Sequence, residues 1–168
     1  MTPDQAKLIA NYTLADYETE IPATKRVIAA VPAGREAYAP SEKCMTALAL
    51  AWHVASAEVF FLNGVIDGEF KGGESAMPDN IKSAADVLAW YDANQPATLE
   101  KAKALSGDAL AKEVDFFGVW QAPAVSFLTL MVKHGSHHRG QLSAYLRPMG
   151  AKVPSIYGPS ADTPIENK

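Results

Sequence analysis

Histidine is the residue type whose placement in this chain could do chemistry. Three of the four histidines, His134, His137 and His138, lie within five residues, and the fourth, His53, lies far upstream in an apolar segment. If residues 134–138 are helical, His134 and His138 lie on one face, one turn apart. With a third imidazole from a facing helix they would form about half of a metal's ligand shell and leave room for water or substrate.

His137 competes with His138 for the position beside His134, because three-residue spacing also brings side chains together on a helix. His137 and His138 diverge by about 100° around the axis, so only one of them points inward with His134. The residues around His138 are more typical of a helix face that points into the bundle than those around His137: Met131, Gln141, Leu142 and Tyr145. We therefore expect His138 to be the ligand and His137 to lie at the rim of the site, behind a ligand or at an interface.

His53 taken alone fits a hydrogen-bonded core residue, but the histidine cluster favours a ligand. Its neighbours at helical spacing are mostly small and leave space around the imidazole: Ala49, Leu50, Ser56, Ala57 and Phe60. We expect a small-molecule pocket between His53 and three residues of the histidine-bearing segment: Phe127, Met131 and Tyr145. Gly135 and Gly140 each cost a helix about 1 kcal/mol relative to alanine, which indicates close backbone approach, access to a site, or packing alone.

The sequence excludes one kind of metal site. Gly135 follows His134 at the position where the zinc-protease pattern His-Glu-x-x-His has its general base, so a peptidase of that kind is excluded. Glu58, the acidic residue nearest His53, is rotated by about 140° along a helix and lies off the ligand face. Gln141 is the better candidate for orienting a ligand or water, although solvation on the helix surface would explain it equally well.

Four long helical patterns, with no convincing alternating strand, account for most of the chain. Their expected bounds are Pro3–Val31, Ser41–Ile66, Ser83–Leu105 and Pro123–Leu146. Ser41 is a candidate N-cap, and Ser83 with Asp86 has the spacing of a capping box. Pro22 and Pro96 suggest kinks in the first and third helices.

These patterns predict an all-α fold, an up-down four-helix bundle in which inward side chains of facing helices hold a cofactor. Residues 106–122 stay unassigned, because their apolar side chains fit a short extended crossover or an irregular packed loop. The prolines and glycines of residues 151–168 indicate an extended C-terminal tail against the bundle.

Composition narrows the setting. The 168 residues fit a single domain spanning 1–168, and a net charge of -4 offers no basic field for nucleic acid. Cys44 is the single cysteine, so no internal disulfide forms, and with no secretory signal in the opening residues we expect a cytoplasmic protein. Residues 44–66 are apolar enough to raise the question of a membrane span, but polar residues interrupt them and we expect a buried core helix and no membrane.

Two stretches of this sequence resemble the DinB family, a group of helical-bundle proteins regarded as metal-dependent enzymes. Residues 134–142 read His-Gly-Ser-His-His-Arg-Gly-Gln-Leu and are followed by Tyr-Leu-Arg at 145–147. Residues 155–162, Ser-Ile-Tyr-Gly-Pro-Ser-Ala-Asp, are similar to the tail of many members. The similarity spans nearly the whole chain, including the single upstream histidine.

The resemblance implies a four-helix bundle, often a homodimer, with a divalent metal held by one histidine of the second helix and two of the last, here His53, His134 and His138. Similar proteins include thiol-dependent S-transferases and a maleylpyruvate isomerase. The family therefore leaves the reaction open.

Three neutral imidazoles leave an ion its charge and an open position, which suits activation of water or of a thiol. We expect a metal-dependent enzyme of hydrolase or thiol S-transferase type, acting on a small molecule and using a low-molecular-weight thiol in the second case. Zinc or nickel is expected first, and iron also suits imidazole. Two alternatives stay open: a non-catalytic metal-binding bundle acting in stress response or dimer assembly, and histidines that bind no metal.

Overall fold

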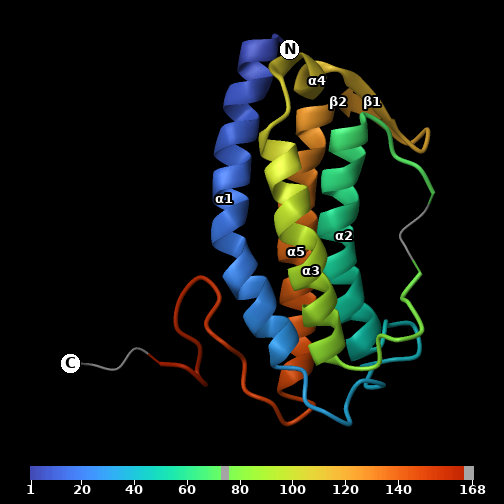
Figure 1. Ribbon diagram of the computed structural model, residues 1–168. Helices are drawn as coiled ribbons and strands as arrows, with labels where there is room; N and C mark the ends of the chain where they lie inside the picture. The colour runs from blue at the N-terminus through green and yellow to red at the C-terminus, as the bar shows by residue number, and fades with distance from the viewer. Residues whose placement is uncertain (73–75, 165–168) are drawn as a thin grey trace.

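Four long helices lie side by side, capped at one end by a short helix and a hairpin (Figure 1). The computed structural model describes residues 1–72 and 76–164. Its elements are α1 (Pro3–Ala29), α2 (Ala47–Asp67), α3 (Ala84–Lys103), α4 (Gly107–Ala111), β1 (Glu113–Phe116), β2 (Trp120–Pro123) and α5 (Ala124–Leu146). The expected long helices are therefore all present.

The helix starts follow from capping side chains. The Ser83 hydroxyl accepts a hydrogen bond from the Asp86 N–H at 3.2 Å, and the Asp86 carboxylate accepts one from the Ser83 N–H, which confirms the predicted capping box of α3. The predicted start of the second helix at Ser41 is wrong. Thr46 is the N-cap of α2, with its hydroxyl accepting from the Ala49 N–H, whereas the Ser41 hydroxyl contacts the Cys44 thiol in the preceding loop.

The helices do not alternate in direction as an up-down bundle would. Figure 1 shows α1 and α5 running one way and α2 and α3 the other. The apolar clusters agree, because the N-terminal halves of α2 and α3 pack with the C-terminal halves of α1 and α5. The connection between α2 and α3, residues 68–83, could span at most roughly 50 Å, which exceeds the roughly 31 Å length of α2. It is therefore long enough to bring the chain back along the bundle, so that α3 begins at the same end of the bundle as α2.

The predicted all-α class is too narrow, because the unassigned residues 106–122 form α4 and an antiparallel hairpin. In the hairpin Phe116 pairs with Trp120 and Val114 with Ala122. Phe117 and Gly118 at its tip both have positive φ, of 54° and 71°, and the Val119 N–H donates to the Phe116 carbonyl. Positive φ at both central residues and this hydrogen bond are features of a type I′ turn, and because Phe116 pairs with Trp120, Val119 is one extra residue between the turn and β2.

The core consists of two apolar clusters, one toward each end of the helices. Along α2 the first cluster ends at Ala55 and the second begins at Phe61, and along α5 they are separated between Met131 and Leu142. His134 and His138 of α5 lie in this gap, as do the buried Ser56 and Glu58 of α2 and Arg139 of α5, and His53 lies at its edge, among the last residues of the first cluster on α2. The middle of the molecule is therefore a polar level between two apolar ends.

Helix α2 is long and apolar enough to cross a membrane by composition, but 72% of its most apolar window is buried inside the molecule. This is the burial of a core helix, as the sequence predicts.

The described part of the C-terminal tail lies against the helices, as expected. The Arg26 guanidinium donates to the Ser155 carbonyl at 3.2 Å, and Arg147 pairs with Asp162 at 3.0 Å. Residues 165–168 of the predicted tail lie outside the described residues.

Candidate metal centre

Three imidazoles meet between α2 and α5. The ring centroid of His53 lies 4.8 Å from that of His134 and 4.3 Å from that of His138, and the last two lie 4.4 Å apart. One ring nitrogen from each residue lies within 4.8 Å of the others. All three side chains are half-buried, so the group is reached from solvent. The convergence predicted from the spacing is observed.

Close packing of α2 against α5 positions the rings. Gly135 allows this approach, since a Cβ built there would lie 3.1 Å from the Glu58 carboxylate of α2. At Gly140 a Cβ would meet nothing within 4 Å. The close approach inferred from two glycines therefore holds for Gly135 and not for Gly140.

Two features prepare the histidines to act as ligands. Burial, helped by the neighbouring His138, His53 and His137, lowers the pKa of His134 from 6.5 to about 4, so this ring is neutral at pH 7. His138 Nδ1 lies 3.0 Å from Gln141 Oε1. With Nδ1–H donating to that oxygen, the lone pair of Nε2 is left for an ion. Gln141 thus contacts the ring that the sequence suggests it orients.

The residues present fit a divalent metal ion. Nitrogens bonded to one ion at about 2.1 Å lie no more than about 4.2 Å apart. The separation of up to 4.8 Å is slightly larger, and small rotations about side-chain bonds close the difference. The donor set, three imidazoles with one of them held neutral, is the kind that zinc, nickel and iron accept.

His137 is exposed on α5, with its ring centroid 4.7 Å from that of His138. It does not belong to the converging group. An exposed position outside the group is compatible with the roles expected for His137, at the rim, behind a ligand or at an interface.

A pocket of about 180 Å³ adjoins the histidines, but its wall differs from the expected one. Beside His53 and His134 it is lined by Ala57, Phe60, Phe61, Phe116 and Phe117. Phe127 and Met131 instead are fully buried in the apolar cluster below it. Tyr145 is buried further along α5 against Tyr38, and its pKa is raised by burial and by the nearby Cys44 thiol.

Three of the pocket's phenylalanines were missed from the sequence. Phe61 belongs to the continuous apolar run of α2, in which no periodicity distinguishes residues that line the site from residues of the core. Phe116 and Phe117 belong to the hairpin that was left unassigned. The signal that could have found them is Phe117-Gly118 between two apolar runs, which is a turn-like dipeptide between candidate strands.

A second polar cluster, also missed, lies on the other side of α2 from the histidines. Glu58 is only 3% exposed, and its carboxylate accepts hydrogen bonds from the hydroxyls of Tyr17, at 2.7 Å, and Tyr91. Burial raises its pKa against the lowering effects of Tyr91, Tyr17, Arg139 and Thr24. As predicted, Glu58 does not point at the ligand group.

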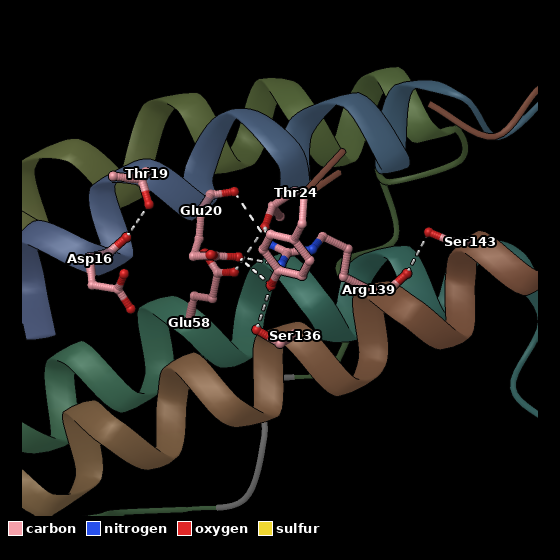
Figure 2. Close-up of polar contacts among 9 residues, drawn as sticks. Asp16, Thr19, Glu20, Thr24, Glu58, Ser136, Arg139 and Ser143 are labelled. Carbon is pink, nitrogen blue, oxygen red and sulfur yellow. Dashed lines mark hydrogen bonds and ion pairs between the residues drawn. The ribbon is translucent and has the colours of Figure 1, made fainter. Parts of the chain in front are cut away.

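Arg139, within the histidine motif of α5, joins this cluster to the surface of the bundle. Its guanidinium is 2% exposed, donates to Thr24 Oγ1 at 3.1 Å, and pairs with the Glu20 carboxylate and the Tyr157 hydroxyl. Figure 2 shows Glu20 and Thr24 of α1 facing Arg139, with Glu58 beneath them and Ser136 on the next turn of α5. The arginine thus serves packing and charge pairing rather than the metal group.

A comparison with known proteins identifies the family. The model of the DinB family matches residues 10–167, nearly the whole chain. The chain belongs to the DinB family. The resemblance seen in the histidine motif is therefore confirmed over the full length of the bundle.

Two similar proteins come from Bacillus subtilis. The protein YrdA of Bacillus subtilis, described as uncharacterized, is 24% identical over 153 residues, which cover 90% of each chain. YjoA of the same organism is 25% identical over 115 residues, covering 67% of this chain and 73% of YjoA. Neither name states a reaction.

Solved structures show the same fold. A DinB-like protein from Bacillus cereus superposes with a TM-score of 0.72 at 25% identity, covering 86% of this chain and 95% of the other. The crystal structure of Bacillus subtilis YjoA gives a TM-score of 0.70 at 21% identity, covering 86% and 96%. This DinB protein therefore shares the family's helical scaffold, and its chemistry has to be argued from its own site.

Proposed function

We propose that this DinB protein is a metal-dependent enzyme in which His53, His134 and His138 hold a divalent ion, zinc or nickel first and iron next. It would activate water or a low-molecular-weight thiol for attack on a small electrophilic substrate, in a hydrolase or thiol S-transferase reaction. The observation that carries the proposal is the convergence of three half-buried imidazoles at the wall of a pocket.

An ion held by three neutral imidazoles supplies Lewis acidity and lowers the pKa of a water or thiol ligand. The protein's own residues do the rest. Gln141 orients the His138 ring through the contact at Nδ1. The pocket wall, apolar apart from the histidines, suits an organic substrate rather than a highly charged one. Cys44 is a free thiol, which suits the reducing cytoplasm that we propose as the setting.

His137 supports the second candidate, a metal-binding protein without catalysis that acts in stress response or dimer assembly. Its ring lies beside that of His138 and is exposed on the rim. If it turned inward it would add a fourth imidazole and close the ligand shell, and closed shells are typical of structural sites.

The test is metal content of protein purified without a histidine tag or a nickel column. We expect about one ion per chain in the wild type and almost none in His134→Ala, because a three-ligand site loses most of its affinity with one ligand. His137→Ala is the matched control and should keep the ion. Loss of the ion from both variants would favour the closed four-histidine site, and a metal-free wild type would refute both proposals.

Activity is tested on the same proteins. The wild type is screened against esters and amides alone, and against electrophiles with low-molecular-weight thiols. We expect turnover in one of the two screens, abolished in His134→Ala and kept in His137→Ala. If the metal-loaded wild type shows no turnover in either screen, the enzyme proposal is refuted and the non-catalytic metal-binding candidate remains.

A further inference from the structure

Phenylalanine is the main component of the pocket beside the histidines. All six phenylalanines, which lie on four different segments of the chain, form one connected set of ring contacts: Phe60, Phe61, Phe70, Phe116, Phe117 and Phe127. Four of them line the pocket. Phe61 and Phe127 belong to the buried apolar cluster, whereas Phe117 is 48% exposed, so core packing does not explain every ring of the set.

The volume of the pocket limits what it can hold. At about 180 Å³ it is well below the roughly 300–1,000 Å³ of pockets that take drug-sized ligands. It is close to the roughly 150 Å³ of an apolar cavity that binds benzene. One six-membered ring fits, and two do not.

The ring faces and edges of the wall suit a flat apolar group. The rings of Phe60 and Phe117 are nearly parallel, with 6° between their planes, and Phe61 meets the His134 ring edge-to-face at 5.6 Å. The other lining residue is Ala57, so apart from the two imidazoles the wall offers no polar partner. A charged group would lose its hydration here without compensation.

Phe117 holds an unfavourable backbone conformation at this wall. Its φ of 54° is in the left-handed region, where a bulky side chain is an outlier, and type I′ turns prefer Asn at this position before Gly. The turn itself gains nothing from phenylalanine, and the side chain stays 48% exposed. Strained residues of this kind persist where the side chain serves a site.

We propose that this phenylalanine-lined pocket is the subsite for a single aromatic ring, or a similarly compact flat apolar group, carried by the substrate, and that Phe117 determines this specificity. The inference rests on the proposed function, because it places the reacting group of the substrate at the three histidines. It adds the substrate class, a small aromatic electrophile or ester.

The test uses two probes that share a metal-chelating head and differ in the ring, acetohydroxamate and benzohydroxamate. Both are titrated into cobalt-loaded protein and followed by the visible spectrum of the cobalt ion. We expect benzohydroxamate to bind the wild type about tenfold more tightly, because burial of one ring is worth that factor or more. Phe117→Asn should reduce the preference to about threefold or less while the melting temperature stays the same or rises, since Asn-Gly suits the turn.

Val119→Asn is the matched control. Val119 belongs to the same turn, and its side chain is 83% exposed and does not line the pocket. This variant should keep the full preference for benzohydroxamate. Equal binding of both hydroxamates by the wild type, or an undiminished preference in Phe117→Asn, would overturn the inference.

Failure of the proposed function gives a different result. Fluorobenzene, followed by fluorine NMR, needs no metal ion to enter the pocket. Protein that retains no cobalt but broadens the fluorobenzene signal, with the effect lost in Phe117→Asn, would refute the metal enzyme and keep the ring pocket. Protein that binds cobalt and acetohydroxamate but not fluorobenzene would refute the ring pocket and keep the metal site.

Discussion

At the scale of single residues, the middle of the bundle contains two kinds of polar group with different roles. The three histidines are half-buried and two of them, His53 and His134, line a pocket, whereas Glu58 is enclosed by side chains of three other helices. Tyr17 of α1 and Tyr91 of α3 donate to its carboxylate, and Thr24 of α1 and Arg139 of α5 complete its surroundings. Burial and the Glu58 charge raise the pKa of both tyrosines, so they remain protonated donors.

Glu58 makes the stability of the protein depend on pH. Its pKa in the folded state is raised above the ordinary 4.5, so the folded state holds this proton more tightly than the unfolded state. The stability that this proton contributes is complete below about pH 4.5 and is lost as the pH rises through the folded-state pKa.

The neutral variant Glu58→Gln tests this dependence. The free energy of unfolding of the wild type, taken relative to Glu58→Gln, should fall as the pH rises above 4.5. Urea denaturation of both proteins between pH 4 and pH 8 measures the difference, in which the titration of other groups cancels. Parallel curves would show that burial does not shift this carboxyl group.

At the scale of elements, α5 carries both the site and the packing that holds it. One helix face brings His134 and His138 to His53, while the neighbouring face places Gly135 and Arg139 against α1 and α2. The two glycines of this helix have the same intrinsic cost but different surroundings, so they offer a direct comparison.

We predict opposite results for alanine at these glycines. Gly140→Ala should raise the free energy of unfolding by about 0.5–1 kcal/mol, because its Cβ enters open space and alanine favours the helix. Gly135→Ala should gain nothing or lose stability, since its Cβ would lie 3.1 Å from the enclosed Glu58 carboxylate. Chemical denaturation measures both. Equal gains in the free energy of unfolding would contradict this prediction, because they would show that α2 and α5 accommodate a Cβ at position 135 without loss of stability.

At the scale of the whole molecule, Arg139 connects three parts of the chain that are distant in sequence. From α5 it reaches Glu20 and Thr24 on α1 and Tyr157 in the tail, and the Tyr157 hydroxyl in turn donates to Glu20 at 2.8 Å. The family motif therefore contains ligand candidates and a structural arginine side by side.

Removing this arginine should destabilise the fold strongly. Arg139→Leu leaves the Glu20 carboxylate without a cationic partner in a largely buried setting, with only the Tyr157 hydroxyl still donating to it, and breaking such a pair costs about 3–5 kcal/mol. Arg147→Leu is the matched control, because its pair with Asp162 is at the surface and is worth about 1 kcal/mol or less. Urea denaturation compares the two variants, and equal losses would contradict the assigned role of Arg139.

Much of the site was predictable because it depends on local spacing. Histidines four apart on a helix share a face whatever the helix packs against, so His134 and His138 could be paired from the sequence. The capping box at Ser83 and Asp86 follows from the same local geometry, whereas the choice of His138 over His137 also needed the apolar character of the residues around His138. His53 needed only the expectation that two apolar helices pack together.

The tertiary structure alone decided the chain direction, the pocket wall and the Glu58 cluster. The connection before α3 is long enough to permit either direction of this helix. The parallel arrangement with α2 is selected because it buries the N-terminal halves of both helices in one apolar cluster. Phe116 and Phe117 reach the histidines because the hairpin folds over the end of α2, a contact between segments more than fifty residues apart. Periodicity describes one element at a time, so side chains brought together from separate elements are settled by packing.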